Sequence, residues 1–552
     1  MTRKPTYFLL VAFAVVAAGC VSKNPNQTVG SSETRLKQLG SHHFKVTTTS
    51  AQAQRAFDRG ITLAYSFGHY AAEQEFRRAA EADPQCAMAY WGIALVNGPH
   101  INFPLVPPDH AATAWEALTR AKSLAKGSSP LEQALIEALS HRYADPQPAD
   151  RSGLDQDYAN AMREVWKTHG ESADAGTLFA ESLMDLHPWD LWVSGTPRPW
   201  TPEIIGTLEQ TLKLNPKHPG ANHYYIHAAE ASPAPERAVI AADRLRKLVP
   251  DAGHMVHMPS HIYARVGRWP DAARCNREAM QVDAQYLAVY PRPGFYAMYM
   301  AHNAHFLSFT AMMLGRQEEA IRSAHLMVEG IPQDFLNNYT ALVDGYMALV
   351  PEVLMRFGRW QEILEEPEPR ADLYLARALW RFTRATALTA MGRTKDAKAE
   401  QVEFEQAAAL VPKDRTMGNN SATNLLNIAT ELLAGEMAAQ AGEYEEAIER
   451  LRNAVKVEDQ LTYDEPPGWI QPTRHTLGAV LLKAGRAKEA EATYREELTR
   501  NPENGWSLMG LRDALQRQGR RQEAEAVNPR YKKAWAGADV TPPSTCYCQK
   551  LD

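Results

Sequence analysis

A short turn pattern, a glycine followed by a charged residue, recurs seven times between residues 267 and 520 of this chain. It occurs at Gly267-Arg268, Gly315-Arg316, Gly358-Arg359, Gly392-Arg393, Gly442-Glu443, Gly485-Arg486 and Gly519-Arg520. Glycine often ends an α-helix because it adopts the left-handed backbone conformation without steric cost, and a polar turn can then start the next helix. The pattern therefore predicts a series of helical hairpins. We find no convincing run of alternating strand residues.

The order of small and large residues supports helices that cross closely. Near the start of the repeats it reads Gly60, Ala72, Phe76, Ala79, Pro84, and near the C-terminus Leu477-Gly478, Ala490, Tyr494, Pro502. Small residues let two helices approach, an aromatic ring fills the gap, and proline closes the unit. This spacing resembles the tetratricopeptide repeat, a helical hairpin of about 34 residues. The resemblance covers most of residues 51–535 and implies an all-α, tetratricopeptide-like helical-hairpin solenoid that winds as a right-handed superhelix.

Two helix starts and two insertions complete this description. Ser129-Pro130-Leu131-Glu132 is a capping box, and Thr201-Pro202-Glu203 places proline and an acidic residue in a first helical turn. Segments 186–199 and 464–469 are rich in aromatic residues and proline and interrupt the helices. We expect segment 186–199 to pack against the solenoid, either as a roof over a site or as a hydrophobic plug.

Three consecutive helical units between residues 219 and 332 carry histidines at offsets of three, four or seven residues. The candidates are His223, His227 and Glu230, then His254, His257 and His261, then His302 and His305. These offsets place the side chains of each stretch on one face of a helix. Pro259 weakens this expectation for the second stretch, because proline either bends a helix or delays its start.

The repeat register points these candidates in the same direction. The resemblance implies that positions 2, 5, 9 and 12 of each unit face the concave groove. Aligning the units on their small residues Ala238, Ala272 and Ala320 places every candidate at one of these positions. Neighbouring first helices pack about 10 Å apart, so imidazoles from adjacent helices can meet over shared ions. The sequence therefore predicts a metal site in the groove, with Asn222 and Asn303 as partners that orient its ligands.

The residue types of the candidate ligands limit which metals and reactions we expect. Imidazole suits copper, iron, zinc and nickel, and eight ligands exceed the needs of one tetrahedral ion. We expect a dinuclear site of the paired type 3 copper kind, with iron or zinc as alternatives, in a copper-dependent oxidoreductase or oxygenase. In this hypothesis Glu230 is a ligand or the catalytic proton acceptor, and the groove takes a small organic or peptide substrate.

Other functions stay open at this stage. They are a non-enzymatic scaffold that binds a peptide or protein partner in the groove, a zinc- or iron-dependent hydrolase or metal-binding protein, and a purely structural polar network. No H-E-x-x-H motif occurs in the sequence, which argues against a familiar metalloprotease. The net charge of −6 and the lack of a basic block exclude nucleic acid as an expected partner.

The N-terminus has the pattern of an export signal. Arg3 and Lys4 precede an apolar run, residues 7–18, that is too short to span a bilayer comfortably. The segment Ala17-Ala18-Gly19-Cys20 resembles a bacterial lipobox, which implies cleavage before Cys20 and lipidation of its thiol. Plain cleavage and an uncleaved anchor are the alternatives. Val21 after the cysteine favours the outer membrane, so we expect an extracytoplasmic protein anchored to a bacterial membrane on its periplasmic face.

These features divide the chain into six parts. They are a lipoprotein signal peptide (1–19), a flexible tether (20–50), N-terminal helical repeats (51–218), histidine-rich central repeats (219–332), C-terminal helical repeats (333–535) and a tail (536–552). In the tail, Cys546 and Cys548 are expected to pair with each other, to pair elsewhere or to bind metal.

Overall fold

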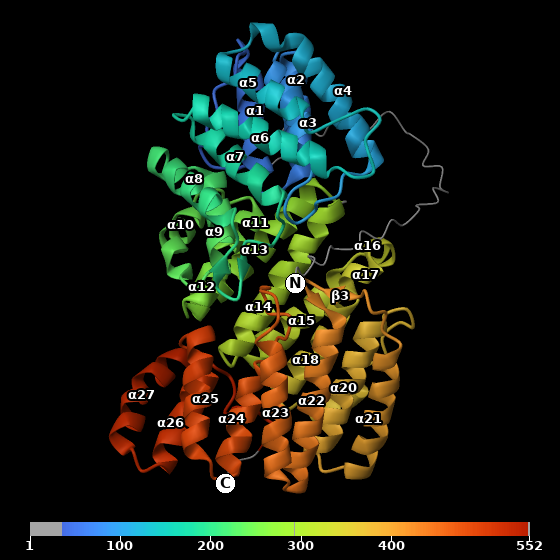
Figure 1. Ribbon diagram of the computed structural model, residues 1–552, viewed down its shortest axis with the longest axis vertical. Helices are drawn as coiled ribbons and strands as arrows, with labels where there is room; N and C mark the ends of the chain where they lie inside the picture. Colours follow the sequence, from blue (N-terminus) through green and yellow to red (C-terminus); the bar gives the residue numbers. More distant parts are fainter. Residues whose placement is uncertain (1–35, 292, 550–552) are drawn as a thin grey trace, which may run out of the picture. The chain divides into compact units, whose positions relative to one another are not determined.

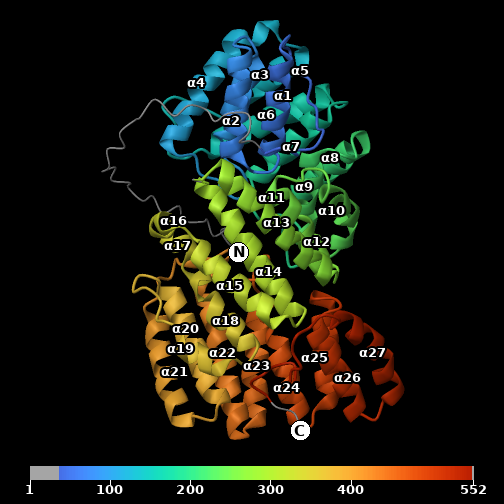
Figure 2. The ribbon, with the colours of Figure 1, turned by 180° about the vertical axis from the view of Figure 1, so that it is seen from behind.

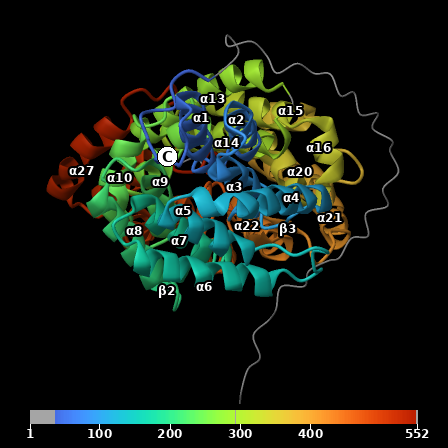
Figure 3. The ribbon, with the colours of Figure 1, turned by 90° about the horizontal axis from the view of Figure 1, so that it is seen from above.

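The computed structural model describes residues 36–291 and 293–549, and this part of the chain is built from α-helices (Figure 1). The predicted signal peptide and Cys20 lie outside the described residues. The first helices are α1 Ala51–Ala64, α2 His69–Ala82, α3 Ala87–Val96, α4 Pro108–Leu124, α5 Pro130–Ser140, α6 Ser152–Thr168, α7 Ala173–Asp185 and α8 Thr201–Leu214. Figure 3 shows α5, α6 and α7 following one another along one side, and each contacts the next.

The central helices carry the histidines. They are α9 Pro219–Glu230, α10 Val239–Leu245, α11 Gly253–His257, α12 Pro259–Arg265, α13 Trp269–Val289, α14 Ala297–Met313 and α15 Gln317–Gly330. In Figures 1 and 2, these green elements lie between the blue N-terminal helices and the orange and red C-terminal helices. The central helices therefore have neighbours on both sides.

The last group of helices also consists of hairpins. They are α16 Gln333–Asn338, α17 Thr340–Val343, α18 Leu349–Arg356, α19 Trp360–Glu365, α20 Tyr374–Ala390, α21 Thr394–Ala409, α22 Ala422–Ala441, α23 Tyr444–Glu458, α24 Thr473–Lys483, α25 Ala487–Arg500, α26 Gly505–Arg517 and α27 Arg521–Ala534. The described strands form two short antiparallel pairs, β1 Trp192–Val193 with β2 Thr196–Pro197 and β3 Thr416–Met417 with β4 Asn420–Ser421. The fold is all-α and tetratricopeptide-like, as predicted.

The predicted glycine turns end helices as the sequence requires. All seven glycines have positive φ, for example 82° at Gly442. At that turn the N–H of Glu443 donates to the carbonyl oxygen of Ala438 over 2.9 Å, which satisfies a carbonyl group at the end of α22. A new helix starts within two residues of every one of these glycines.

Close helix crossings follow the predicted small and large residues. Phe76 of α2 lies between Gly60 of α1 and Gly92 of α3, where an added Cβ would come within 2.7 and 2.5 Å of the ring. Tyr494 of α25 repeats this arrangement between Gly478 and Gly510. The same packing unit therefore occurs near both ends of the repeats. The capping box at Ser129 is also present, because its side chain and that of Glu132 each accept the other residue's backbone N–H.

Residues 36–50 differ from the predicted flexible tether. They have no regular secondary structure, but Leu36, Phe44 and Val46 are buried in the core. The N–H groups of Lys37 and Gln38 both donate to Asp251 Oδ2 over 2.7 Å. The tether prediction is therefore wrong for residues 36–50, because their polar composition hid a few well-spaced core residues.

The described part of the tail also packs against the repeats. Thr545 Oγ1 donates to the carbonyl oxygen of His475 over 2.7 Å, and Cys546 is bonded to Cys548. None of the helices in the described residues is long and apolar enough to cross a membrane.

Candidate metal centre

Helices α9, α11, α12 and α14 bring the predicted histidines together. α12 packs on α9, and α11 packs on α14. Pro259 separates α11 from α12, but Met258 between them keeps helical dihedral angles of −50° and −37°. His257 and His261 therefore remain one helical turn apart across this junction, with ring centroids 4.7 Å apart.

The first cluster consists of His223, His227 and His254. One ring nitrogen from each lies within 4.8 Å of the others. His223 Nε2 and His254 Nε2 are 3.1 Å apart. All three side chains are buried, with His223 completely shielded from solvent. We call this cluster triad A.

The second cluster consists of His257, His261 and His302, and we call it triad B. Its ring nitrogens also lie within 4.8 Å of one another. His261 Nε2 lies 2.7 Å from His257 Nε2 and 3.5 Å from His302 Nε2. The second histidine stretch of the sequence is therefore divided between the two triads. His254 joins triad A, while His257 and His261 join triad B.

Glu230 connects the two triads. Its Oε1 accepts the Nδ1–H of His227 over 2.9 Å, and its Oε2 accepts the Nδ1–H of His261 over 2.5 Å. Burial raises the pKa of Glu230, but His261 and His227 outweigh it and lower the pKa to about 2. The carboxylate is therefore charged and orients one histidine of each triad, as carboxylates near metal-bound histidines do.

Two further histidines have their tautomers fixed by acceptors. His223 Nδ1–H donates to the carbonyl oxygen of Tyr65 over 2.7 Å, and His257 Nδ1–H donates to Asn276 Oδ1 over 2.6 Å. Asn276 Nδ2 donates to the carbonyl oxygen of Ala272, which turns Oδ1 toward His257. A neutral imidazole that donates from Nδ1 presents a lone pair at Nε2.

These tautomers place lone pairs against one another. His257 and His261 both donate from Nδ1, so two neutral rings would direct Nε2 lone pairs at each other across 2.7 Å. That arrangement is unfavourable unless a proton or a cation lies between the nitrogens. In triad A, buried His227 Nε2 has no hydrogen-bond partner among the described residues. The donor set therefore fits a bound metal ion in each triad.

Burial keeps most of these rings neutral. It lowers the pKa values of five ligands, His223, His227, His254, His257 and His302. Burial also acts to lower the pKa of His261, but the charge of Glu230 outweighs it and the pKa is raised. Metal-free triad B can therefore hold a proton on His261, which a metal ion would have to displace.

His305 lies outside both triads. Its ring packs against Tyr346 at a centroid distance of 5.5 Å, and burial lowers its pKa to about 3. His305 therefore shares the groove-facing side of α14 with His302 without joining the ring nitrogens of triad B.

Asn222 and Asn303 do not orient the candidate ligands. The amide of Asn222 donates to the carbonyl oxygens of Pro216 and His218, and that of Asn303 donates to Asp283. Both amides hydrogen-bond to residues that are not candidate ligands, so the prediction for them is wrong. Asn276, which comes from the second helix of its hairpin, performs this role for His257.

Sequence reasoning also missed Glu465. Its Oε2 lies 3.7 Å from His261 Nδ1 and has no hydrogen-bond partner within residues 36–291 and 293–549. Burial raises the pKa of Glu465 to about 8. The aromatic, proline-rich insertion 464–469 was a signal for this segment, but no periodicity singled out its carboxylate.

Segment 186–199 covers triad A. A pocket beside this triad is lined by Trp189, Trp192, His227 and Glu230, together with Ile101, Met184, His187, Leu191, Ala231, Thr462 and Tyr463. Trp192 Nε1 donates to the carbonyl oxygen of Ala228 in α9 over 2.8 Å, which ties the segment to the helix of triad A. We call this cavity pocket A.

A second pocket reaches triad B, and we call it pocket B. It is lined by His302, His305, Tyr346 and Glu465, together with Met298, Ala301, Met327, Ile331, Val343, Asp464 and Pro466. Segment 462–466 contributes to both pockets. Each triad therefore borders its own cavity.

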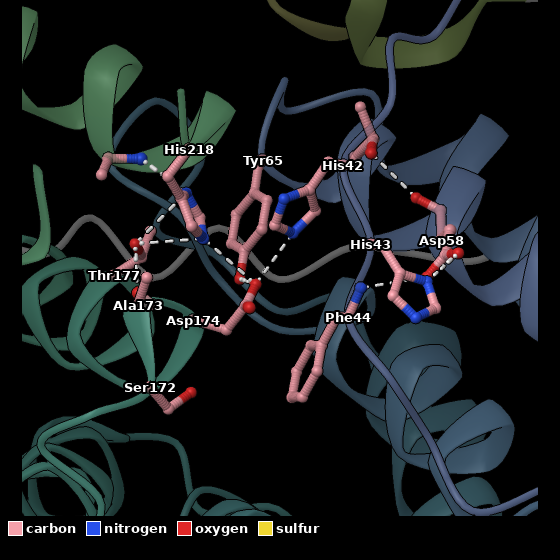
Figure 4. A network of polar contacts seen from close by, with 12 residues as sticks. His42, His43, Phe44, Asp58, Tyr65, Ser172, Ala173, Asp174, Thr177 and His218 are labelled. Carbon is pink, nitrogen blue, oxygen red and sulfur yellow. Dashed lines mark hydrogen bonds and ion pairs between the residues drawn. The ribbon is translucent and has the colours of Figure 1, made fainter. Parts of the chain in front are cut away.

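A neighbouring histidine group has a different arrangement (Figure 4). Asp174 Oδ1 accepts hydrogen bonds from Tyr65 Oη, His42 Nε2 and His218 Nε2 over 2.8, 2.9 and 3.1 Å. His218 Nδ1 accepts the N–H of Ala221, so its Nε2 carries the proton given to Asp174. This Asp174 hub is satisfied by hydrogen bonds, and it holds Tyr65, whose carbonyl oxygen accepts from His223.

Comparisons with known proteins add little about function. No family model matches the chain. The cellulose synthase operon protein C of Xanthomonas axonopodis pv. citri (strain 306) is 33% identical over 168 residues, 29% of this chain. The matched residues are 10% of the relative's length, so this chain covers about a tenth of that relative.

Solved structures with some likeness have low identity. Human IFIT1 with m7Gppp-AAAA is 11% identical over 89% of this chain and 92% of that chain, with a TM-score of 0.33. The Cut9–Hcn1 assembly of APC/C is 13% identical over 90% of this chain and 78% of that chain, with a TM-score of 0.29. Similarity at this level says nothing about what this chain binds. The chain is a tetratricopeptide-like helical-repeat protein whose buried histidine triads can hold metal ions.

Proposed function

We propose that this protein is a metalloenzyme with two metal ions, one in each triad. The observation that carries the proposal is the pair of Nε2 atoms of His257 and His261, which are 2.7 Å apart although both rings donate from Nδ1. A metal ion bound by both nitrogens would remove the repulsion between the lone pairs. Three protein ligands leave a coordination position open, which is typical of catalytic rather than structural metal sites.

Copper is the metal that we favour. Each triad is a set of three imidazole nitrogens, and a further group of Glu230, His261 and Glu465 shares His261 with triad B. Imidazole binds copper strongly, and copper also stands highest in the usual affinity order of divalent first-row metals. Two adjacent copper ions would supply one-electron redox chemistry at each triad. This supports an oxygen-dependent oxidoreductase acting on a small organic substrate, in which Glu230 fixes ligand orientation.

The alternatives have less support. A hydrolase needs a free base beside a metal-bound water, but both oxygens of Glu230 already accept from histidines. Burial raises the pKa of Glu465 to about 8, so this carboxyl group is mostly protonated at neutral pH and is a poor base. A peptide groove needs exposed side chains, whereas the histidines of triad A are buried and segment 186–199 covers them. Iron would keep the redox chemistry, and zinc would remove it.

The proposal also includes export and a lipid anchor at Cys20, as the N-terminal sequence predicts. A Cys20→Ala variant should lose incorporation of a labelled fatty acid and leave the membrane fraction. Unchanged incorporation and fractionation would contradict the anchor. A small organic substrate and the membrane are therefore the partners that we propose.

Oxygen consumption tests the enzymatic part. Full-length protein, purified without a histidine tag and loaded with copper, is tested with a panel of small organic reductants. We expect substrate-dependent oxygen uptake in the wild type and in the control His305→Ala, and its loss in His257→Ala. If the protein binds two copper ions but consumes no oxygen with any class of reductant, the oxidoreductase is wrong while the metal centre stands.

A further inference from the structure

Pocket A has walls of a distinct chemistry. Its aromatic side chains include Trp189, Trp192 and Tyr463, and Leu191 and Met184 add apolar surface. Its ionisable lining residues include His227 of triad A and Glu230, whose two oxygens accept hydrogen bonds from His227 and His261. Such a wall favours a flat, apolar molecule with few polar groups.

Trp189 is held against a metal ligand by an unusual backbone. Its φ is 59°, in the left-handed region that large side chains rarely occupy. Its ring stands perpendicular to the imidazole of His227, with centroids 5.4 Å apart. Strained residues cluster at ligand-binding sites because surrounding contacts must enforce them. The strained backbone at Trp189 therefore indicates that the space beside His227 is a candidate ligand-binding site.

The surrounding contacts that enforce this conformation are in place. Trp200 Nε1 donates to the carbonyl oxygen of Asp190 over 2.8 Å, and Thr201 Oγ1 donates to that of Leu191 over 2.5 Å. His187 stacks on Trp200 at a centroid distance of 3.6 Å. Segment 186–199 is thus anchored on both sides of Trp189. Pocket A is built before any ligand arrives, which reduces the entropy cost of binding.

Pocket B differs from pocket A in the side chains that would contact a ligand. Its lining includes the thioether and aliphatic side chains of Met298, Met327 and Ile331 and the carboxyl groups of Asp464 and Glu465. Among the residues lining it, Tyr346 supplies an aromatic ring, which faces His305 rather than a histidine of a triad. Pocket B therefore offers fewer aromatic side chains to a ligand than pocket A, which is lined by two tryptophans and a tyrosine.

From these contrasts we infer that pocket A is the substrate site and that it takes a single-ring aromatic molecule with a hydroxyl group. The ring packs against Trp189 and the aromatic wall, and the hydroxyl oxygen reaches the ion held by His227 and its triad. This inference rests on the proposed metal centre, because the ion receives the hydroxyl group. It adds the substrate class and assigns Trp189 to substrate binding.

Binding to the zinc-loaded full-length protein tests the inference without any redox chemistry. The probe is 4-nitrophenol, followed by its absorbance, and cyclohexanol is a competitor of similar size without an aromatic ring. We expect 4-nitrophenol to bind and cyclohexanol to compete poorly. Trp189→Ala should weaken probe binding about tenfold, because an aromatic contact and its buried area are lost. Trp189→Phe should restore most of the affinity.

Tyr346→Ala is the matched control, since it removes the aromatic ring of pocket B. It should change the affinity less than about twofold. Equal competition by cyclohexanol, unchanged affinity in Trp189→Ala, or a loss confined to Tyr346→Ala would overturn the inference. Zinc content is measured in the same samples. Protein that holds zinc but binds no probe contradicts only this inference, whereas protein that binds no zinc contradicts the metal centre itself.

Discussion

Two histidine groups lie close to each other in this protein and behave differently. In the Asp174 hub, each hydrogen bond to Oδ1 joins a donor to an acceptor, and His218 Nδ1 accepts a backbone N–H. In triad B, two nitrogens that both lack protons in the neutral rings approach to 2.7 Å. Histidine clustering alone therefore does not identify a metal site. What distinguishes the two groups is whether each close polar contact of a ring nitrogen joins a donor to an acceptor.

The largest effect on stability is expected from Asp174→Asn. Tyr65, His42 and His218 all donate to Oδ1 of Asp174, so asparagine keeps one acceptor oxygen but loses the negative charge that strengthens these three buried hydrogen bonds. We expect a loss of about 3 kcal/mol in the free energy of unfolding. Denaturant unfolding measures it. The metal stoichiometry should stay at two, and a variant that keeps full stability would show that the hub is not structural.

Among the residues that orient the ligands, Glu230 is expected to affect metal binding most, and Glu230→Gln tests this. A glutamine oxygen can accept from one histidine only, and its NH₂ group opposes the Nδ1–H of the other. Metal affinity should fall about 10- to 100-fold, measured by competition with a chelator. Exposed Glu236→Gln, in the short 3-10 helix between α9 and α10, is the matched control and should leave affinity unchanged. Equal affinities in the two variants would contradict the bridging role of Glu230.

Acid should destabilise the hub. Burial raises the pKa of Asp174, but His218 and His42 outweigh it and hold the pKa far below the ordinary 3.8. A depressed aspartate pKa stabilises the folded state above the ordinary value, and this contribution is lost as pH falls below it. Asp174→Asn should therefore flatten the loss of stability below about pH 4. Parallel unfolding curves for wild type and variant across this range would contradict the prediction.

A smaller effect is expected from Asn276→Leu, which removes the acceptor for His257. Metal affinity should fall about tenfold, since the ring is no longer held in its tautomer. Asn222→Leu is the control, because Asn222 was predicted from the sequence to orient a ligand but contacts only backbone carbonyls. If Asn222→Leu weakens metal binding as much as Asn276→Leu, the hydrogen bond to His257 has no special role.

The sequence predicted features that depend on local spacing. Helical geometry explains both the glycines that end helices and the offsets of His223, His227 and Glu230. The sequence alone was therefore enough to predict these two features. The division of His254, His257 and His261 between two triads could not be predicted from the sequence. It depends on how α11 and α12 pack against α9 and α14. Asn276 and Glu465 come from other segments, and no local period connects them with the histidines.

Metal stoichiometry in variants specific to each triad tests the two-ion centre most directly. Full-length protein without a histidine tag is loaded with copper, dialysed and measured by elemental analysis. We expect two ions per chain in the wild type, one in His223→Ala/His254→Ala, one in His257→Ala/His261→Ala, and two in the hub control His42→Ala, all with the same helical circular dichroism. A wild-type protein that retains no ion, or a single ion lost equally in both triad variants, would contradict a centre of two separate three-histidine sites.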